Sequence, residues 1–187
     1  MDKIAKQTLN KRLTIPFVVT LIGVLLIIVS LFLPYMTAVG EMAEYIENNP
    51  DRIEIKDLNL TASDLADISI LSVNKLITGV YGEDDGEIAN IIVMVLGGFL
   101  AMTMLFTLLK KPIAIMIFDL FTCGTFFFLG FLMKEDFITA DTYAWGIGYY
   151  AFLISAVVVF AAAIWMLVKK ISVKKELKAV AIAQPEA

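Results

Sequence analysis

The fold is decided by residues 88–133, IANIIVMVLGGFLAMTMLFTLLKKPIAIMIFDLFTCGTFFFLGFLM, in which Lys110-Lys111-Pro112 separates two long apolar runs. Ile88 to Leu109 has 22 residues and Ile113 to Met133 has 21, and about 20 suffice for a helix to cross a hydrocarbon core. So short a link forces the two helices to lie antiparallel. Pro112 suits a helix start, because the first N–H groups have no partner within the helix. The segment predicts a helical membrane hairpin.

A third apolar run precedes this hairpin and a fourth follows it. The first predicted span is Leu13 to Met36, 24 residues without a charge, and the last is Thr142 to Val168. The predicted spans are therefore 13–36, 88–109, 113–133 and 142–168. A secretory signal peptide is the competing interpretation of the first run, but the run exceeds the apolar region of about 7 to 15 residues in such peptides. We favour a retained span, ended or bent at Pro34.

Composition places the chain among integral membrane proteins. Of 187 residues, 59% are hydrophobic and 18% are charged, whereas a soluble domain is about half apolar and a quarter charged. The length accommodates four spans and one modest polar module. The sequence has no histidine and a single cysteine, Cys123, which removes the commonest general base, the usual zinc ligand and any intrachain disulfide. We therefore expect no enzymatic activity.

Charge is strongly segregated along the sequence. The amino-terminal segment, the Lys110-Lys111 turn and the carboxyl-terminal tail hold eleven lysines and arginines against three acids, a net charge of +8, whereas the other loops hold four against fifteen, a net charge of −11. Because basic loops tend to stay in the cytoplasm, we expect both termini, including a basic tail at 169–187, to be cytoplasmic. Both acidic loops would then face outward from the plasma membrane.

Residues 37–87 form the one long polar segment, expected to be an extracytoplasmic cap and called the acidic cap below. Glu41 to Glu47 is expected to continue the first helix by a turn or two. Alternating apolar residues predict a short strand within 53–60, and helical spacing predicts a helix from Leu65 to Val80 that Gly82 ends. The predicted fold is an all-α, four-helix transmembrane bundle whose cap, between spans one and two, holds short helices and one or two short strands.

Four carboxylates surround Gly86 just before the second span. They are Glu83, Asp84, Asp85 and Glu87. Oxygen ligands of this kind suit calcium, which makes the four residues weak candidates for a metal site, although the ligand spacing of an EF-hand loop is missing. We favour a solvated acidic loop at a helix amino terminus, where negative charge is stabilising. We assign no metal and no cofactor.

Asp119 is the only ionisable residue well inside a predicted span. A charge in hydrocarbon costs at least about 2.5 kcal/mol, so a proton or cation relay is one interpretation. The other is structural, because Asp119 lies within about two turns of the predicted cytoplasmic end, where Lys110, Lys111, Arg12 or water can neutralise it. We favour the structural interpretation, since no second carboxylate or lysine within a span continues a relay.

Lysines gather directly after the fourth span. They are Lys169, Lys170, Lys174 and Lys175. Each is a candidate contact for anionic lipid, worth about 1 kcal/mol near the surface, although the same residues would also fix the topology.

Small residues within the spans predict faces on which helices pack closely. They include Gly97, Gly98, Gly124 and Gly148. Packing within one chain is the favoured interpretation.

Three short segments carry a family resemblance: Ser30-Leu31-Phe32-Leu33-Pro34-Tyr35, Asp85-Gly86 and Gly146-Ile147-Gly148-Tyr149-Tyr150. With them the chain resembles uncharacterised small four-span membrane proteins of Gram-positive bacteria, which implies a bacterial plasma-membrane location and no known activity. The topology alone also resembles that of claudins and tetraspans. The first outer loop contains neither tryptophan nor cysteine, so the claudin loop pattern is missing and no junction-forming role follows.

These observations favour a non-enzymatic interaction or accessory protein. Its acidic cap would contact a partner protein or an envelope component, because the cap is the only elaborated polar surface. A small oligomeric transporter or channel subunit that uses Asp119 is the alternative. The expected partners are membrane lipid and either another protein or a second copy of the chain, and no nucleic acid.

Overall fold

The computed structural model describes residues 3–49, 62–139 and 141–183, and four long helices dominate it. They are α1 (Lys3–Ser30), α5 (Glu83–Leu108), α6 (Pro112–Asp136) and α7 (Ile147–Ala183). Each contains a stretch long and apolar enough to span a membrane: Lys11–Ser30, Glu83–Leu108, Pro112–Lys134 and Ile147–Glu176. The chain is therefore mostly helical, with the composition of a multi-pass membrane protein.

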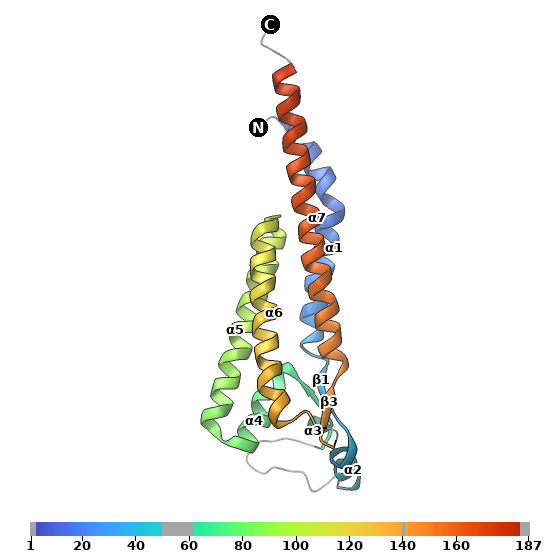
Figure 1. Ribbon diagram of the computed structural model, residues 1–187, viewed down its shortest axis with the longest axis vertical. Helices are drawn as coiled ribbons and strands as arrows, with labels where there is room; N and C mark the ends of the chain where they lie inside the picture. The colour runs from blue at the N-terminus through green and yellow to red at the C-terminus, as the bar shows by residue number, and fades with distance from the viewer. Residues whose placement is uncertain (1–2, 50–61, 140, 184–187) are drawn as a thin grey trace.

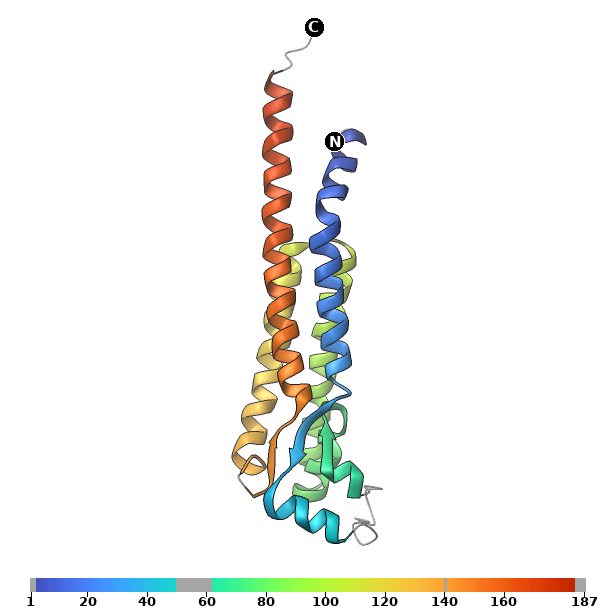
Figure 2. The same cartoon turned by 90° about the vertical axis from the view of Figure 1, so that its right-hand side faces the viewer.

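The long helices form two antiparallel pairs, α1 with α7 and α5 with α6, as Figures 1 and 2 show. Both described chain ends lie at one end of the molecule, which we call the terminal end, and the α1–α7 pair continues there beyond the tip of the α5–α6 hairpin. The Lys110 ammonium lies 5.1 Å from the centre of the Phe17 ring, a cation–π contact that holds this tip against α1. Beyond the tip, Arg12 and Glu176 form an ion pair of 2.8 Å between α1 and α7.

The hairpin turn has a regular helix-ending geometry. The Lys110 N–H donates to the Thr107 carbonyl and the Lys111 N–H donates to the Phe106 carbonyl, both at 2.9 Å. Together they make a Schellman motif, in which the residue after the helix adopts the left-handed conformation. Lys110 does so with φ 53°, at a cost of about 1–2 kcal/mol for a non-glycine residue. Pro112 then starts α6 at its first position, as the sequence predicts.

A three-stranded antiparallel sheet closes the opposite end of the molecule, which we call the sheet end. Its strands are β1 (Pro34–Ala38), β2 (Asp67–Ser69) and β3 (Tyr143–Trp145), in the order β2-β1-β3. Met36 of β1 lies opposite Ile68 of β2 and Trp145 of β3. The predicted bundle with one or two short strands in its cap therefore differs in where the strands lie, because β1 begins inside the predicted first span and β3 comes from the connection between the third and fourth long helices. The strand predicted within 53–60 lies outside the described residues.

Three helix boundaries differ from the predicted spans. The first helix ends at Ser30, well before Met36, because Pro34 lacks an N–H and disfavours helical geometry at the preceding residue. The second begins at Glu83, so the acidic residues before Ile88 belong to the helix itself. The fourth starts at Ile147, after β3, and continues through most of the predicted tail to Ala183.

Residues 30–35 and 146–150 pack against each other. The Gly146 N–H donates to the Tyr35 carbonyl at 2.8 Å. A β-carbon on Gly148 would lie within 2.9 Å of the carbonyl oxygens of Ser30, Leu33 and Pro34, closer than real β-carbons approach. The start of α7 can lie against the turn between α1 and β1 only because this position is glycine.

The other predicted small-residue contacts differ. A β-carbon on Gly97, Gly98 or Gly124 would meet no atom of the described chain within 4 Å, so these glycines do not mediate close packing between the described helices. Gly23 does, since its β-carbon would lie 2.7 Å from Val159 Cγ2 on α7.

Short helices complete the sheet end. Helices α2 (Gly40–Asn48) and α3 (Ala62–Ala66) lie between β1 and β2, and the 3-10 helix η1 (Ile70–Ser72) and α4 (Val73–Tyr81) lead from β2 to α5. Helix α2 is separated from α1 by β1, so it does not continue the first span. The single helix predicted from Leu65 to Val80 is interrupted by β2, where Ile68 is buried in the sheet. It resumes as α4 and ends at Gly82, which has φ 109°.

Candidate functional site

Two buried tyrosines hold the sheet end together. Tyr35 of β1 and Tyr143 of β3 are both inaccessible to solvent. The Tyr143 hydroxyl donates to the Leu65 carbonyl at 3.0 Å. The Tyr35 ring makes edge contacts with Phe126 of α6 and Trp145 of β3, with ring centres 5.4 and 5.5 Å apart. The sheet end is thus a packed platform assembled from distant parts of the chain.

Burial also changes the acidity of these two phenols. It raises the pKa of Tyr143 to about 12, and burial together with the neighbouring Tyr149 raises the pKa of Tyr35 above its ordinary value. Both changes follow from the cost of placing a phenolate away from water. Both side chains are therefore neutral structural groups near neutral pH.

Helix α2 is fixed to this platform at its amino end. The Val39 N–H donates to the Thr142 carbonyl at 2.8 Å, and the Met42 N–H donates to the Asp141 carbonyl at 3.1 Å. These bonds satisfy donors that a helix start leaves without partners. Ile46 is buried beneath the helix.

Exposed acidic side chains are concentrated at the sheet end. Those described there are Glu41, Glu44, Glu47, Asp64, Asp67, Glu83, Asp84, Asp85, Glu87 and Asp141. The described lysine side chains at this end are Lys75 and Lys134. The acidic character predicted for the cap is therefore present on the folded surface, and it extends to Asp141 outside residues 37–87.

The four carboxylates around Gly86 lie in the first turns of α5. Glu83, Asp84 and Asp85 occupy its first turn, where negative charge is stabilised by the free N–H groups. Across the described residues, no three acidic or cysteine side chains come close enough together to hold a metal ion. The carboxylates have the placement expected of charges at a helix amino terminus.

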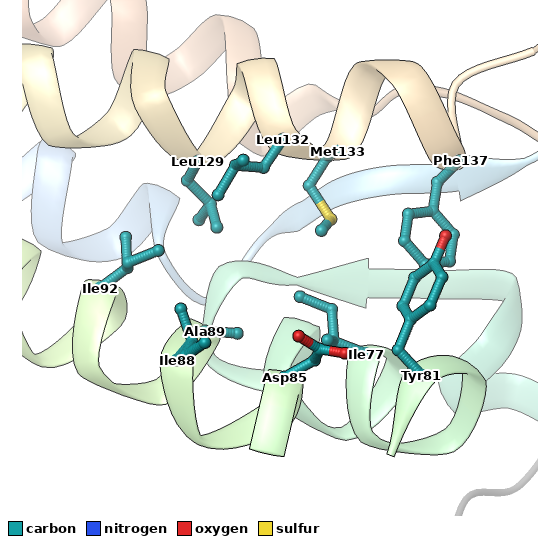
Figure 3. Close-up of a pocket in the computed structure, with 10 residues that line it drawn as sticks. All are labelled: Ile77, Tyr81, Asp85, Ile88, Ala89, Ile92, Leu129, Leu132, Met133 and Phe137. Carbon is teal, nitrogen blue, oxygen red and sulfur yellow. The ribbon is translucent and has the colours of Figure 1, made fainter. Parts of the chain in front are cut away.

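Asp85 also forms part of a pocket between the α4–α5 hairpin and the end of α6, with a volume of about 270 Å³. Figure 3 shows its lining: Ile77, Tyr81, Asp85, Ile88, Ala89, Ile92, Leu129, Leu132, Met133 and Phe137. The rings of Tyr81 and Phe137 meet edge to face at 5.9 Å at one end of the pocket. The pocket is not evident from the sequence, because its walls belong to three helices whose relative positions depend on the fold.

The pocket combines apolar walls with one carboxylate. Asp85 is the one acidic residue of the lining and is exposed. Such a site suits an apolar group that carries a positive charge or a hydrogen-bond donor near its end.

Asp119 is buried on the inner face of α6, with only 1% of its surface exposed. The ring of Phe118, the preceding residue, contacts both Phe99 and Phe106 of α5. Its Oδ1 atom has no hydrogen-bond partner within the described part of the chain. Lys110 does not pair with it and instead contacts Phe17.

The four lysines that follow the predicted fourth span, 142–168, occupy one continuous helix. Lys169, Lys174 and Lys175 are exposed on α7, whereas Lys170 is half-buried and lines a groove with Lys111. The sequence does not show that Lys111 and Lys170 line one groove, because this depends on the hairpin turn lying against α7.

Comparisons with protein-family models, with curated proteins and with solved structures gave no match. The chemistry of the surfaces described above therefore provides the basis for a functional proposal.

Proposed function

We propose that the protein is a non-enzymatic, multi-pass membrane protein whose acidic cap binds a basic surface of a partner protein or envelope component. In this proposal the sheet end faces outward and both termini are cytoplasmic. The support for that orientation is the separation of charge, with basic residues at the terminal end and acidic residues at the sheet end.

The observation that carries the proposal is the way the acidic end is built. Its exposed carboxylates come from α2, α3, β2, α5 and the connection before β3. The sheet and the buried Tyr143 hydroxyl hold these segments in fixed positions. A rigid surface with one sign of charge favours a complementary partner and speeds its association.

Helix α2 is the part of this surface best suited to direct contact. Glu41, Glu44 and Tyr45 are exposed and share one face of the helix, and Tyr45 has 55% of its surface accessible. Tyrosine is frequent among residues that dominate binding energy. Carboxylates beside it favour lysine or arginine on the partner.

The test is photo-crosslinking in native membranes with a benzoylphenylalanine probe at Tyr45. We expect one dominant crosslinked product, weakened at least severalfold by Glu41→Gln with Glu44→Gln. The matched control is Lys174→Gln with Lys175→Gln, which removes two exposed charges from the terminal end and should leave the product unchanged. Crosslinking that is equally strong from the exposed Tyr150, or unaffected by the glutamate changes, would refute a specific contact.

Asp119 supports the alternative, a small oligomeric transporter or channel subunit. Asp119 is a buried carboxylate inside a candidate span, and one of its oxygens has no hydrogen-bond partner among the described residues, an arrangement found in ion and proton pathways. The test is ion flux into liposomes that contain the purified protein, compared with Asp119→Asn. Flux that depends on Asp119 supports this function, and flux that is absent or unchanged removes it.

A further inference from the structure

A groove at the terminal end of α6 has a composition unlike that of the pocket in Figure 3. It lies between the start of α6 and α7 and has a volume of about 470 Å³. Its lining consists of Phe106, Lys111, Pro112, Ile113, Ala114, Ile117, Leu167 and Lys170. Within the described part of the chain, the groove therefore has an apolar floor, two lysines and no acidic residue.

The two lysines reach the groove from different elements. Lys111 belongs to the hairpin turn and is exposed, and Lys170 is half-buried on α7. The amino end of α6 adds positive potential at the same corner. Because the Lys110 contact with Phe17 fixes the turn against the α1–α7 pair, Lys111 and Lys170 are held together by the fold.

The apolar part of the groove continues along the candidate span. Ile113 and Ile117 lie one turn apart on α6 and are 59% and 47% exposed. Both belong to a stretch apolar enough to cross a membrane. Trp165 is also exposed, a little more than one turn from Lys170 on α7. Tryptophan and lysine at a helix end are typical of the boundary between headgroups and acyl chains.

We propose that this groove binds one anionic phospholipid, with the phosphate between Lys111 and Lys170 and an acyl chain along Ile113 and Ile117. Charge complementarity selects the headgroup, since the lining formed by the described residues has two cations and no carboxylate. The apolar lining, which continues along the candidate span, selects a lipid over a soluble anion. The site differs from the acidic cap in position and charge, so it goes beyond the function proposed above.

Binding in the groove differs from the general electrostatic attraction between exposed lysines and an anionic membrane. Lys174 and Lys175 are exposed on α7 beyond the groove and do not line it. They would draw anionic lipid toward the protein without holding one molecule. Retention of a single lipid should therefore depend on Lys111 and Lys170 far more than on Lys174 and Lys175.

The test is native mass spectrometry of the full chain in detergent with equal amounts of phosphatidylglycerol and phosphatidylcholine that have matched acyl chains. We expect one phosphatidylglycerol to be retained in preference to phosphatidylcholine. Lys111→Gln with Lys170→Gln should lower this preference roughly thirtyfold, as two lost lysine–headgroup interactions imply. Lys111→Arg with Lys170→Arg should retain it.

Two further measurements complete the test. Lys174→Gln with Lys175→Gln should change the preference less than about twofold, because these lysines stand outside the groove. Ala114→Trp, which fills the groove and keeps both charges, should reduce lipid retention while leaving the helical circular dichroism unchanged. The proposal is overturned if the two glutamine pairs act alike, or if the Lys111 and Lys170 pair has no effect.

Discussion

The Tyr143 hydroxyl and the Leu65 carbonyl are joined by a hydrogen bond of 3.0 Å between residues 78 positions apart in the chain. The bond ties β3, just before the last long helix, to α3 in the acidic cap. Replacement by Tyr143→Phe leaves the buried Leu65 carbonyl without this donor. We expect a loss of about 1–3 kcal/mol in unfolding free energy, measured by thermal or denaturant unfolding in detergent. Tyr150→Phe, at an exposed position, is the control and should be neutral.

The buried phenols of Tyr143 and Tyr35 predict a loss of stability at high pH. Burial raises the pKa of Tyr143 to about 12 and also raises the pKa of Tyr35, compared with about 10 in the unfolded chain. Their contribution is complete below about pH 10 and is lost as the pH rises toward 12. Melting temperatures measured across this range should fall, and the fall should be shallower in Tyr143→Phe. Equal slopes in the two proteins would contradict the assignment.

Gly148→Ala should disrupt the junction between α1 and α7. The added β-carbon would lie within 2.9 Å of three backbone oxygens, which cannot move aside without shifting the turn. Overpacking of this kind costs about 1–3 kcal/mol or more, visible as a lower melting temperature. Gly97→Ala adds the same methyl group where nothing lies within 4 Å. Its stability should be equal or slightly greater.

Removal of the buried Asp119 carboxyl should stabilise the isolated protein. Its Oδ1 has no partner within the described residues and its surface is 1% exposed, so Asp119→Leu relieves a desolvation cost of about 1–3 kcal/mol. Thr122→Val is the comparison. Its hydroxyl donates to the Phe118 carbonyl at 2.8 Å, and the change should alter stability by less than about 1 kcal/mol. A less stable Asp119→Leu protein would show that the carboxyl makes a favourable interaction.

The proposed orientation predicts opposite accessibility for the two ends. In a Cys123→Ser background, a cysteine at Glu44 should react with a membrane-impermeant maleimide added to intact cells. A cysteine at Lys174 should react only after permeabilisation. Both parent residues are exposed, so burial does not limit either reaction. The reverse pattern would invert the topology and place the acidic cap in the cytoplasm.

The apolar runs predicted the four long helices, because the length of an apolar run can be read directly from consecutive residues. Lys110-Lys111-Pro112 likewise predicted the antiparallel turn, since its chemistry lies in adjacent residues. The sheet was not predicted at its true positions. Tyr143 to Trp145 is too short to be recognised as a strand on its own, and its strand geometry depends on pairing with β1.

The candidate site residues likewise divide into those predictable from local sequence and those that depend on tertiary neighbours. The acidic surface followed from composition, whereas Asp119 is buried and two of its expected partners are engaged elsewhere, Lys110 with Phe17 and Arg12 with Glu176. The pocket beside Asp85 and the groove between Lys111 and Lys170 depend on which helices become neighbours. The start of α5 was also not predicted at its true position. The helix begins at Glu83, directly after Gly82, which ends α4 with φ 109°.

The central position of β1 has a consequence for biosynthesis. This strand is the first to be made, yet its neighbour β3 leaves the ribosome only after the first three long helices. Until then one edge of β1 has no strand beside it, and such an edge is a template for wrong pairing. Completion of the sheet therefore coincides with delivery of the last long helix. A chain truncated before Tyr143 should be a substrate for quality-control proteolysis, whereas in the full chain β3 pairs with the free edge of β1.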